Sequence, residues 1–394
     1  MRKVKVNGTG SAIADYLFSG IDFAGPEFSA LRSAKPGDGG LEPGLLVLTE
    51  DFERFTGKNS KEALSPIVEN REPDTFNVGG PAAVALINAA QLSDRDSTTF
   101  NFYSCGGNDE ASDNVRSILE RTPLCLDKYQ TVDATSPFTY VLSDPSFQDG
   151  AGERTFVNNI GSAWLVLPHH LDESFFAGDI VVFGGTALVP KIHAELSQLV
   201  ETGKDSGCIT VVTTVYDFPN ERKSSGEPWP LGRNDSTYKH IDLLICDGEE
   251  AIRLSGASSL PVAADMLINK GVSALMITNG KRDVFCFSNG SLFGDVRRYL
   301  PVSDAVERTR EQTTVTGDTT GCGDNFAGGV IYSMVSQLQE EKVVLDLEDA
   351  CAWGIASGDF ACFYLGGTYQ ESQGGEKREK VKGIYQEYIA GQSV

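Results

Sequence analysis

Toward its C-terminal end the chain reads Asp-Thr-Thr-Gly-Cys-Gly-Asp, residues 318–324, and the helix-like segment 325–339 follows at once. Glycine lets the backbone approach a ligand closely, and successive N–H groups at a helix N-terminus can hold an anion. A phosphoryl group in transfer is such an anion. The pattern therefore predicts that N–H groups at the start of this helix, where glycines flank Cys322, can bind an anion.

The acid at the end of this stretch has two interpretations. Asp324 would face an acceptor hydroxyl and take its proton as a general base. Alternatively, Asp324 is a first-turn acid that complements the helix dipole, and the glycines form a tight turn.

Upstream of this stretch, short apolar runs rich in β-branched residues alternate with helical patterns. The runs are residues 180–183, 209–215, 241–246 and 274–278. Such alternation indicates βαβ units, so we expect an α/β fold with a mostly parallel central sheet covered by helices on both faces. Ligands of such sheets bind beyond the carboxyl ends of the strands.

Two regions depart from this alternation. They lie within about residues 16–75, where glycines and prolines gather, and 128–160, where residues alternate as in exposed strands. We expect both to contribute to a small β lid over the site. Without an internal repeat or a clear linker, the pattern predicts one domain over 1–394.

Composition restricts the partners. Of 394 residues, 40% are hydrophobic and 22% are charged, which is ordinary for a globular protein, and the formal net charge is −22. Nucleic-acid binding usually depends on a basic patch, and anionic lipids would repel so acidic a surface. We therefore expect neither nucleic acid nor a membrane as a partner. A bound polyanion would need local positive potential from N–H groups, a few cations and metal ions.

The eight cysteines form no CxxC pair, and most lie in apolar runs such as 244–246 and 284–286. Free cysteine commonly behaves as a small buried hydrophobe, so we expect reduced core thiols. Residues 1–6 include basic residues, but no apolar segment of a signal peptide follows them. These observations favour a cytoplasmic protein.

The stretch 318–324 resembles the DTxGAGD signature of the ribokinase-like (pfkB) family of sugar and nucleoside kinases, with Cys322 in place of the usual alanine. The resemblance extends from about residue 4 to 367. It implies a ribokinase-like fold, ATP and Mg²⁺ as cofactors, Asp324 as the catalytic base, and an anion hole at Gly321, Cys322 and Gly323. Dependence on a monovalent cation and a homodimer formed through the lids are further properties that the family suggests.

On the acceptor side, the resemblance implies that Asp15 grips substrate hydroxyls and that Gly79 and Gly80 form a substrate loop. A solvated loop acid is the other interpretation of Asp15. Arg154 lies in a Gly-Glu-Arg segment similar to one in the family's lid, where it would meet substrate or phosphate, or form a surface ion pair. Val84 departs from the family, which typically has a substrate-contacting asparagine there.

On the nucleotide side, Asp247 and Glu250 resemble an N-x-x-E motif that organises the Mg²⁺–phosphate network, with Asp247 in place of the asparagine. Acids at a helix N-terminus are the alternative. The resemblance further implies that Thr320 and the turn at Gly280 and Lys281 lie near the nucleotide.

The acceptor is left open between a sugar and a nucleoside. Residues 40–52 are similar to adenosine-kinase-like members, which also have an extended segment before the double-glycine loop. A kinase-like binding protein without catalysis is an alternative from another class. A hydrolase or a Walker-type NTPase is disfavoured, because the sequence has no GxSxG, HExxH or GxxxxGK[ST] pattern.

Overall fold

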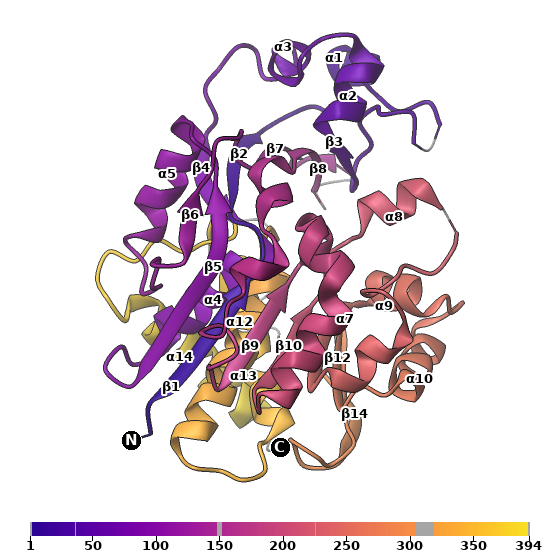
Figure 1. Cartoon of the computed structure of the whole chain (residues 1–394). Coiled ribbons are helices and arrows are strands. Elements are labelled where there is room, and N and C mark those ends of the chain that lie inside the picture. The colour runs from indigo at the N-terminus through magenta and orange to yellow at the C-terminus, as the bar shows by residue number, and fades with distance from the viewer. Residues whose placement is uncertain (1, 36, 148–151, 225, 304–318, 393–394) are drawn as a thin grey trace.

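A computed structural model describes residues 2–35, 37–147, 152–224, 226–303 and 319–392. Asp318, the first residue of the DTTGCGD stretch, lies outside these ranges. The described chain forms two sheets, a large one flanked by helices and a smaller one beyond one end of it (Figure 1).

The large sheet has nine strands in the order β14-β13-β12-β11-β10-β9-β1-β5-β6. All neighbours from β12 through β6 are parallel, whereas the last two pairs, β12-β13 and β13-β14, are antiparallel. The strands are β1 (Val4–Thr9), β5 (Thr98–Gly106), β6 (Tyr129–Thr131), β9 (Ile180–Gly184), β10 (Ile209–Thr213), β11 (Leu243–Asp247), β12 (Ala274–Asn279), β13 (Arg282–Ser288) and β14 (Val296–Leu300).

Helices cover both faces of this sheet, and each face has its own apolar core. One face packs against α4 (Pro81–Leu92), α5 (Glu110–Leu119), α12 (Cys322–Gln339), α13 (Leu347–Ala361) and α14 (Glu376–Gln392). The other face packs against α7 (Pro190–Asp205), α9 (Gly248–Ser255) and α10 (Leu260–Lys270). Shorter elements between them are η1 (Gly161–Leu165), η2 (Pro168–His170), η3 (Thr186–Leu188), α8 (Phe218–Lys223) and η4 (Asp235–His240).

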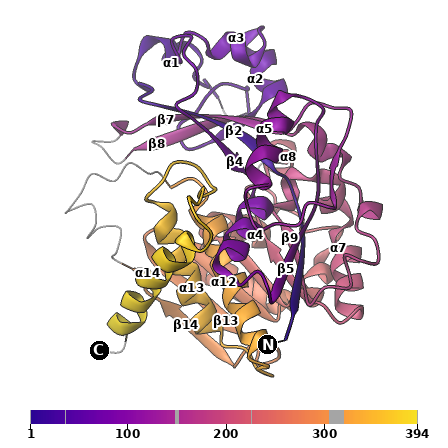
Figure 2. The ribbon, with the colours of Figure 1, turned by 90° about the vertical axis from the view of Figure 1, so that its left-hand side faces the viewer.

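The small sheet has five strands in the order β3-β8-β7-β2-β4. They are β2 (Ile13–Ser19), β3 (Leu46–Leu48), β4 (Thr75–Gly79), β7 (Phe138–Asp144) and β8 (Glu153–Asn159). Three short helices, α1 (Pro26–Ala30), α2 (Thr49–Thr56) and α3 (Ser60–Leu64), lie on its far side (Figure 2). Asp51 of α2 forms an ion pair with Arg222 of α8, which connects this layer to the large sheet.

The two faces of the small sheet differ in chemistry because side chains alternate along each strand. Phe18 and Leu142 lie on the face that packs against the three helices, together with Phe52 from α2. Asp15 is separated from Phe18 by an odd number of positions on β2, so its side chain lies on the other face. That face is turned toward the large sheet, since Arg154 on β8 reaches Thr320 from it.

The predicted α/β class with a mostly parallel, helix-covered sheet is confirmed. No helix among the described residues is both long and apolar enough to cross a membrane.

Candidate active site

The glycine-rich turn ends where α12 begins. Gly321 is the N-cap with φ 72°, a left-handed conformation that suits glycine. A Cβ on Gly321 would lie 2.7 Å from Gly367 Cα, whereas one on Gly323 would meet nothing within 4 Å. The first turn of a helix leaves its N–H groups without intrahelical partners. Cys322 N–H contacts Thr319 O at 3.3 Å, so the N–H groups of Gly323 and Asp324 are the better placed donors for an anion.

Asp324 lies in this first turn. Burial raises the pKa of its carboxyl group to about 6. The carboxylate is therefore the main form at neutral pH, and it is more basic than an exposed aspartate. A carboxylate of this kind is suited to accept a proton from a hydroxyl group near pH 7.

A buried lysine contacts the residue that holds the glycine-rich turn in place. The sequence patterns did not indicate this lysine. Asn325 donates from Nδ2 to Gly321 O (2.9 Å) and to Gly367 O (2.8 Å), which joins the two loops. Lys377 of α14, 1% exposed, donates from Nζ to Asn325 Oδ1 at 2.8 Å. Burial lowers the pKa of Lys377 to about 7, although Glu371 opposes the shift.

The predicted acceptor residues lie together at the edge of the small sheet. A Cβ on Gly79 would lie 2.0 Å from Asp15 Oδ2, so this carboxylate packs directly over the glycine. Gly80 is the N-cap of α4 with φ 97°, and a Cβ there would lie 2.2 Å from Ser11 O. Asp15 is 6% exposed, which disagrees with its interpretation as a solvated loop acid.

The acceptor loop is tied to the loop beside the glycine-rich turn. Asn77 donates to Leu365 O (2.8 Å) and Thr368 O (3.1 Å), and Thr368 Oγ1 donates to Val78 O (2.7 Å). Val84 is 1% exposed and backs this junction, since a Cβ on Gly367 would lie 2.8 Å from Val84 Cγ2. The valine therefore has a packing role at the position where the sequence resemblance implies an asparagine.

The pairing of strands in the small sheet places further polar side chains on the same face as Asp15. Asp15 is paired with Asn77 on β4 and with Thr139 on β7, and Thr139 is paired with Asn158 on β8. Residues paired in this way share a face of the sheet. Asn158 Oδ1 is buried and has no hydrogen-bond partner among the residues that the structure describes. Thr139 and Asn158 were not identified from the sequence, because only the strand pairing aligns them with Asp15.

Arg154 lies on the same face and donates from Nη1 to Thr320 Oγ1 at 2.6 Å. The contact joins the small sheet to the glycine-rich turn. Arg154 therefore lies close to the candidate anion hole.

Asp247 and Glu250 form a reciprocal capping box at the start of α9. Asp247 Oδ1 accepts from Glu250 N (2.7 Å), and Glu250 Oε2 accepts from Asp247 N (3.0 Å) and from Thr214 Oγ1 (2.5 Å). Burial, with Asp247 beside it and a smaller effect of Asp324, raises the pKa of Glu250 to about 8. The described residues contain no cluster of three or more acidic, histidine or cysteine side chains suited to a metal.

The turn at Gly280 and Lys281 connects β12 to β13, and Gly280 has φ 58°. It lies near the start of α9, because a Cβ on Gly248 would be 3.4 Å from Asn279 Oδ1. The acids of α9 and this turn thus share the edge formed by the carboxyl ends of β11 and β12.

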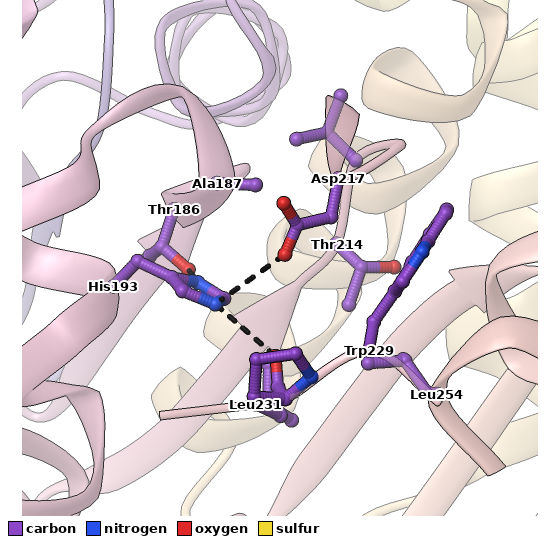
Figure 3. Close-up of a pocket in the computed structure, with 10 residues that line it drawn as sticks. Thr186, Ala187, His193, Thr214, Asp217, Trp229, Leu231 and Leu254 are labelled. Atoms are coloured by element: carbon purple, nitrogen blue, oxygen red, sulfur yellow. Dashed lines mark hydrogen bonds and ion pairs between the residues drawn. The ribbon is translucent and has the colours of Figure 1, made fainter. Parts of the chain in front are cut away.

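A second polar cluster surrounds a small cavity near the ends of β9 and β10 (Figure 3). His193 contacts Thr186 Oγ1 through Nδ1 (2.9 Å), and its Nε2 contacts Pro230 O (3.1 Å) and Asp217 Oδ2 (3.6 Å). The cavity volume is about 10 Å³, roughly that of one water molecule. His193 and its partners therefore form a satisfied structural cluster rather than a ligand site.

Comparison with known proteins identifies the class. The sequence pattern of the pfkB family of carbohydrate kinases matches residues 51–373. The chain therefore belongs to this family. No curated protein sequence matches the chain.

Solved structures share the fold at low sequence identity. Adenosine kinase from Sinorhizobium meliloti has a TM-score of 0.68 at 15% identity, covering 100% of both chains. Arabidopsis thaliana ribokinase, complexed with ribose and ATP, has a TM-score of 0.61 at 16% identity, covering 97% of this chain and 99% of the other. Adenosine kinase from Schistosoma mansoni, with 2-fluoroadenosine, has a TM-score of 0.66 at 12% identity, covering 93% and 97%.

Proposed function

We propose that the protein transfers the γ-phosphoryl group of ATP to a hydroxyl group of a sugar or a sugar-containing small molecule. The observation that carries this proposal is the position of Asp324. Its carboxylate, with a pKa raised to about 6, lies in the first turn of α12 together with the N–H group of Gly323. This arrangement supports the proposal, because in-line phosphoryl transfer requires a proton acceptor beside groups that bind the transferred anion.

In this mechanism the acceptor hydroxyl group lies between the small sheet and α12. Asp15 accepts hydrogen bonds from other hydroxyl groups of the acceptor, and the backbone of Gly79 and Gly80 allows close approach. Asp324 takes the proton of the attacking hydroxyl. The N–H groups of the first turn of α12, with Arg154 beside Thr320, stabilise the negative charge on the transferred group.

The residues proposed to bind cofactors are compatible with ATP and Mg²⁺. The open space at Gly323 leaves room for phosphate oxygens, and Thr320, Gly280 and Lys281 are proposed to contact the nucleotide. Mg²⁺, which keeps several waters, supplies charge neutralisation of the phosphates when bound. Asp247 and Glu250 would hold it through water, and the capping box already uses one carboxylate oxygen of each residue. The family resemblance also suggests that activity depends on a monovalent cation. We propose no binding residues for it among the described residues.

A nucleoside is the second candidate acceptor. The observation in its favour is the full-length similarity to an adenosine kinase, together with the long segment between Asp15 and Gly79. Cytoplasmic location and a dimer formed through the small sheets remain expectations from the sequence.

The proposed function is tested by ADP release from Mg·ATP across a panel of sugars, sugar phosphates and nucleosides. Turnover on one acceptor class, absent without that acceptor, would support the proposal and name the substrate. ATP binding without turnover on any acceptor would favour a non-catalytic binding protein instead.

Asp15→Ala is expected to raise the acceptor KM by about tenfold or more, because a hydrogen bond to a charged group contributes about 1.5–3 kcal/mol. The KM for ATP should change little, since Asp15 lies in the small sheet. Steady-state kinetics with each substrate varied in turn provides the measurement. An unchanged acceptor KM would place the acceptor elsewhere.

Glu250→Gln is expected to raise the Mg²⁺ concentration needed for half-maximal turnover by about tenfold, as with other partners that act through bound water. The amide retains an acceptor for Thr214 Oγ1, so the start of α9 should persist. A Mg²⁺ titration at saturating substrates measures the effect. An unaltered titration curve would leave Glu250 with its capping role alone.

A further inference from the structure

Two cysteine side chains meet at the glycine-rich turn. Cys322 is the first residue of α12, and Cys362 is the C-cap of α13. Their Sγ atoms are 3.4 Å apart. Glycines allow the helices to approach this closely, since a Cβ on Gly329 would lie 2.3 Å from Trp353 O and one on Gly358 would lie 3.2 Å from Cys322 O.

Exposure distinguishes this pair from the other cysteines. Cys322 and Cys362 are both partly exposed, and so is Cys125. Cys351 also lies beside another thiol, that of Cys286, but both of these residues are 0% exposed. The chain therefore contains one cysteine pair that a dissolved oxidant can reach and one that packing protects. All eight cysteines are free thiols as expected, but Cys125, Cys322 and Cys362 are only partly buried and do not belong to the core.

We propose that Cys322 and Cys362 form a reversible disulfide that switches off the site at the start of α12. The sulfur atoms need to approach to about 2.05 Å, which small shifts of the two helix ends can supply. The loss of activity on oxidation rests on the proposed phosphoryl transfer. Formation of the disulfide itself does not depend on that function.

The oxidant is a low-molecular-weight disulfide, RSSR. The thiolate of one cysteine attacks RSSR, so that a protein–SR bond forms and one RS⁻ leaves. The second cysteine's thiolate then attacks the protein-bound sulfur and displaces the second RS⁻. The two cysteines lose two electrons, RSSR gains them, and the two thiol protons end on two RSH molecules. Excess thiol reverses both steps.

Oxidation would act on the site through the backbone. Drawing Cys322 Sγ toward α13 displaces the first turn of α12, which carries Asp324 and the N–H groups of the proposed anion hole. A misplacement of about 1 Å in such a site can cost about 10²-fold in rate. Asn325 and Lys377 hold the same turn in the reduced protein, so the two arrangements compete for one structural element.

The experiment equilibrates the full chain in glutathione buffers of graded oxidised fraction. Disulfide mapping by mass spectrometry is expected to find the 322–362 crosslink and reduced Cys286 and Cys351. ADP release should fall by about 10²-fold in the oxidised protein and return with dithiothreitol. Cys362→Ser, which leaves the proposed catalytic residues in place, should keep basal turnover and lose sensitivity to oxidised glutathione. Cys125→Ser is the matched control and should keep that sensitivity.

Mg·ATP affinity, measured by calorimetry, is a second readout and is expected to weaken by about tenfold on oxidation through loss of an N–H contact to phosphate. A reduced protein without turnover on any acceptor would count against the proposed function, and the switch would then be judged by this affinity. Absence of the crosslink overturns the inference. So does a crosslinked protein whose turnover and Mg·ATP affinity equal those of the reduced protein.

Discussion

Asp324→Asn should lower kcat by about 10²- to 10⁴-fold, the usual contribution of a positioned general base. The amide keeps the size of the side chain but cannot take the hydroxyl proton at neutral pH. Mg·ATP affinity should be retained, because the N–H groups of the turn are unchanged. In the wild type, kcat/KM should decline as the pH falls below about 6, where the carboxyl group becomes protonated.

The same substitution should stabilise the fold. An acid whose folded pKa is raised from 3.8 to about 6 binds more protons when folded, so stability falls as the pH rises through that window. At pH 7 and above nearly the full cost is present, about 3 kcal/mol from the pKa difference. Asp324→Asn should therefore unfold at higher denaturant concentration at pH 7 and show little difference near pH 4.

A matched control addresses the alternative that Asp324 only complements the helix dipole. Glu348 is a first-turn acid of the neighbouring helix α13, and its partly exposed side chain forms an ion pair with Arg298. Glu348→Gln should leave turnover unchanged. If Asp324→Asn behaves in the same way, Asp324 is not the base.

The sequence predicted individual strands and helix starts because each of these depends only on neighbouring residues. Strand β9 needs only its β-branched run, and the start of α12 needs only glycines before a helical pattern. Asp247 and Glu250 show the limit of such reasoning. A metal site and a capping box require the same acids at the same spacing, and only the hydrogen bonds identify the capping box.

The contacts that complete the site join residues remote in sequence. Asn77 reaches Thr368 across 291 positions, Lys377 reaches Asn325 across 52, and Cys322 meets Cys362 across 40. Such pairs depend on how α12, α13 and α14 pack, which no short window records. A buried lysine in α14 has no sequence signal at all, because the helix reads as a charged surface segment.

Lys377→Met should stabilise the protein at neutral pH while lowering turnover, because the ammonium group is buried to hold Asn325 rather than to strengthen the fold. Its folded pKa, lowered from 10.5 to about 7, means that the unfolded chain binds more protons between these values. Wild-type stability due to this group therefore rises as the pH increases from 7 to 10.5.

The stability difference between Lys377→Met and the wild type should consequently shrink with pH. From the pKa difference, burying the charge costs about 4–5 kcal/mol at pH 6 and about 2 kcal/mol at pH 9. Urea unfolding at the two pH values measures this change. Lys380→Met is the matched control on the same helix: Lys380 pairs with Glu376 at the surface and should show no such gain. A destabilised Lys377→Met protein at both pH values, or one with undiminished turnover, would mean that the lysine serves packing and not the glycine-rich turn.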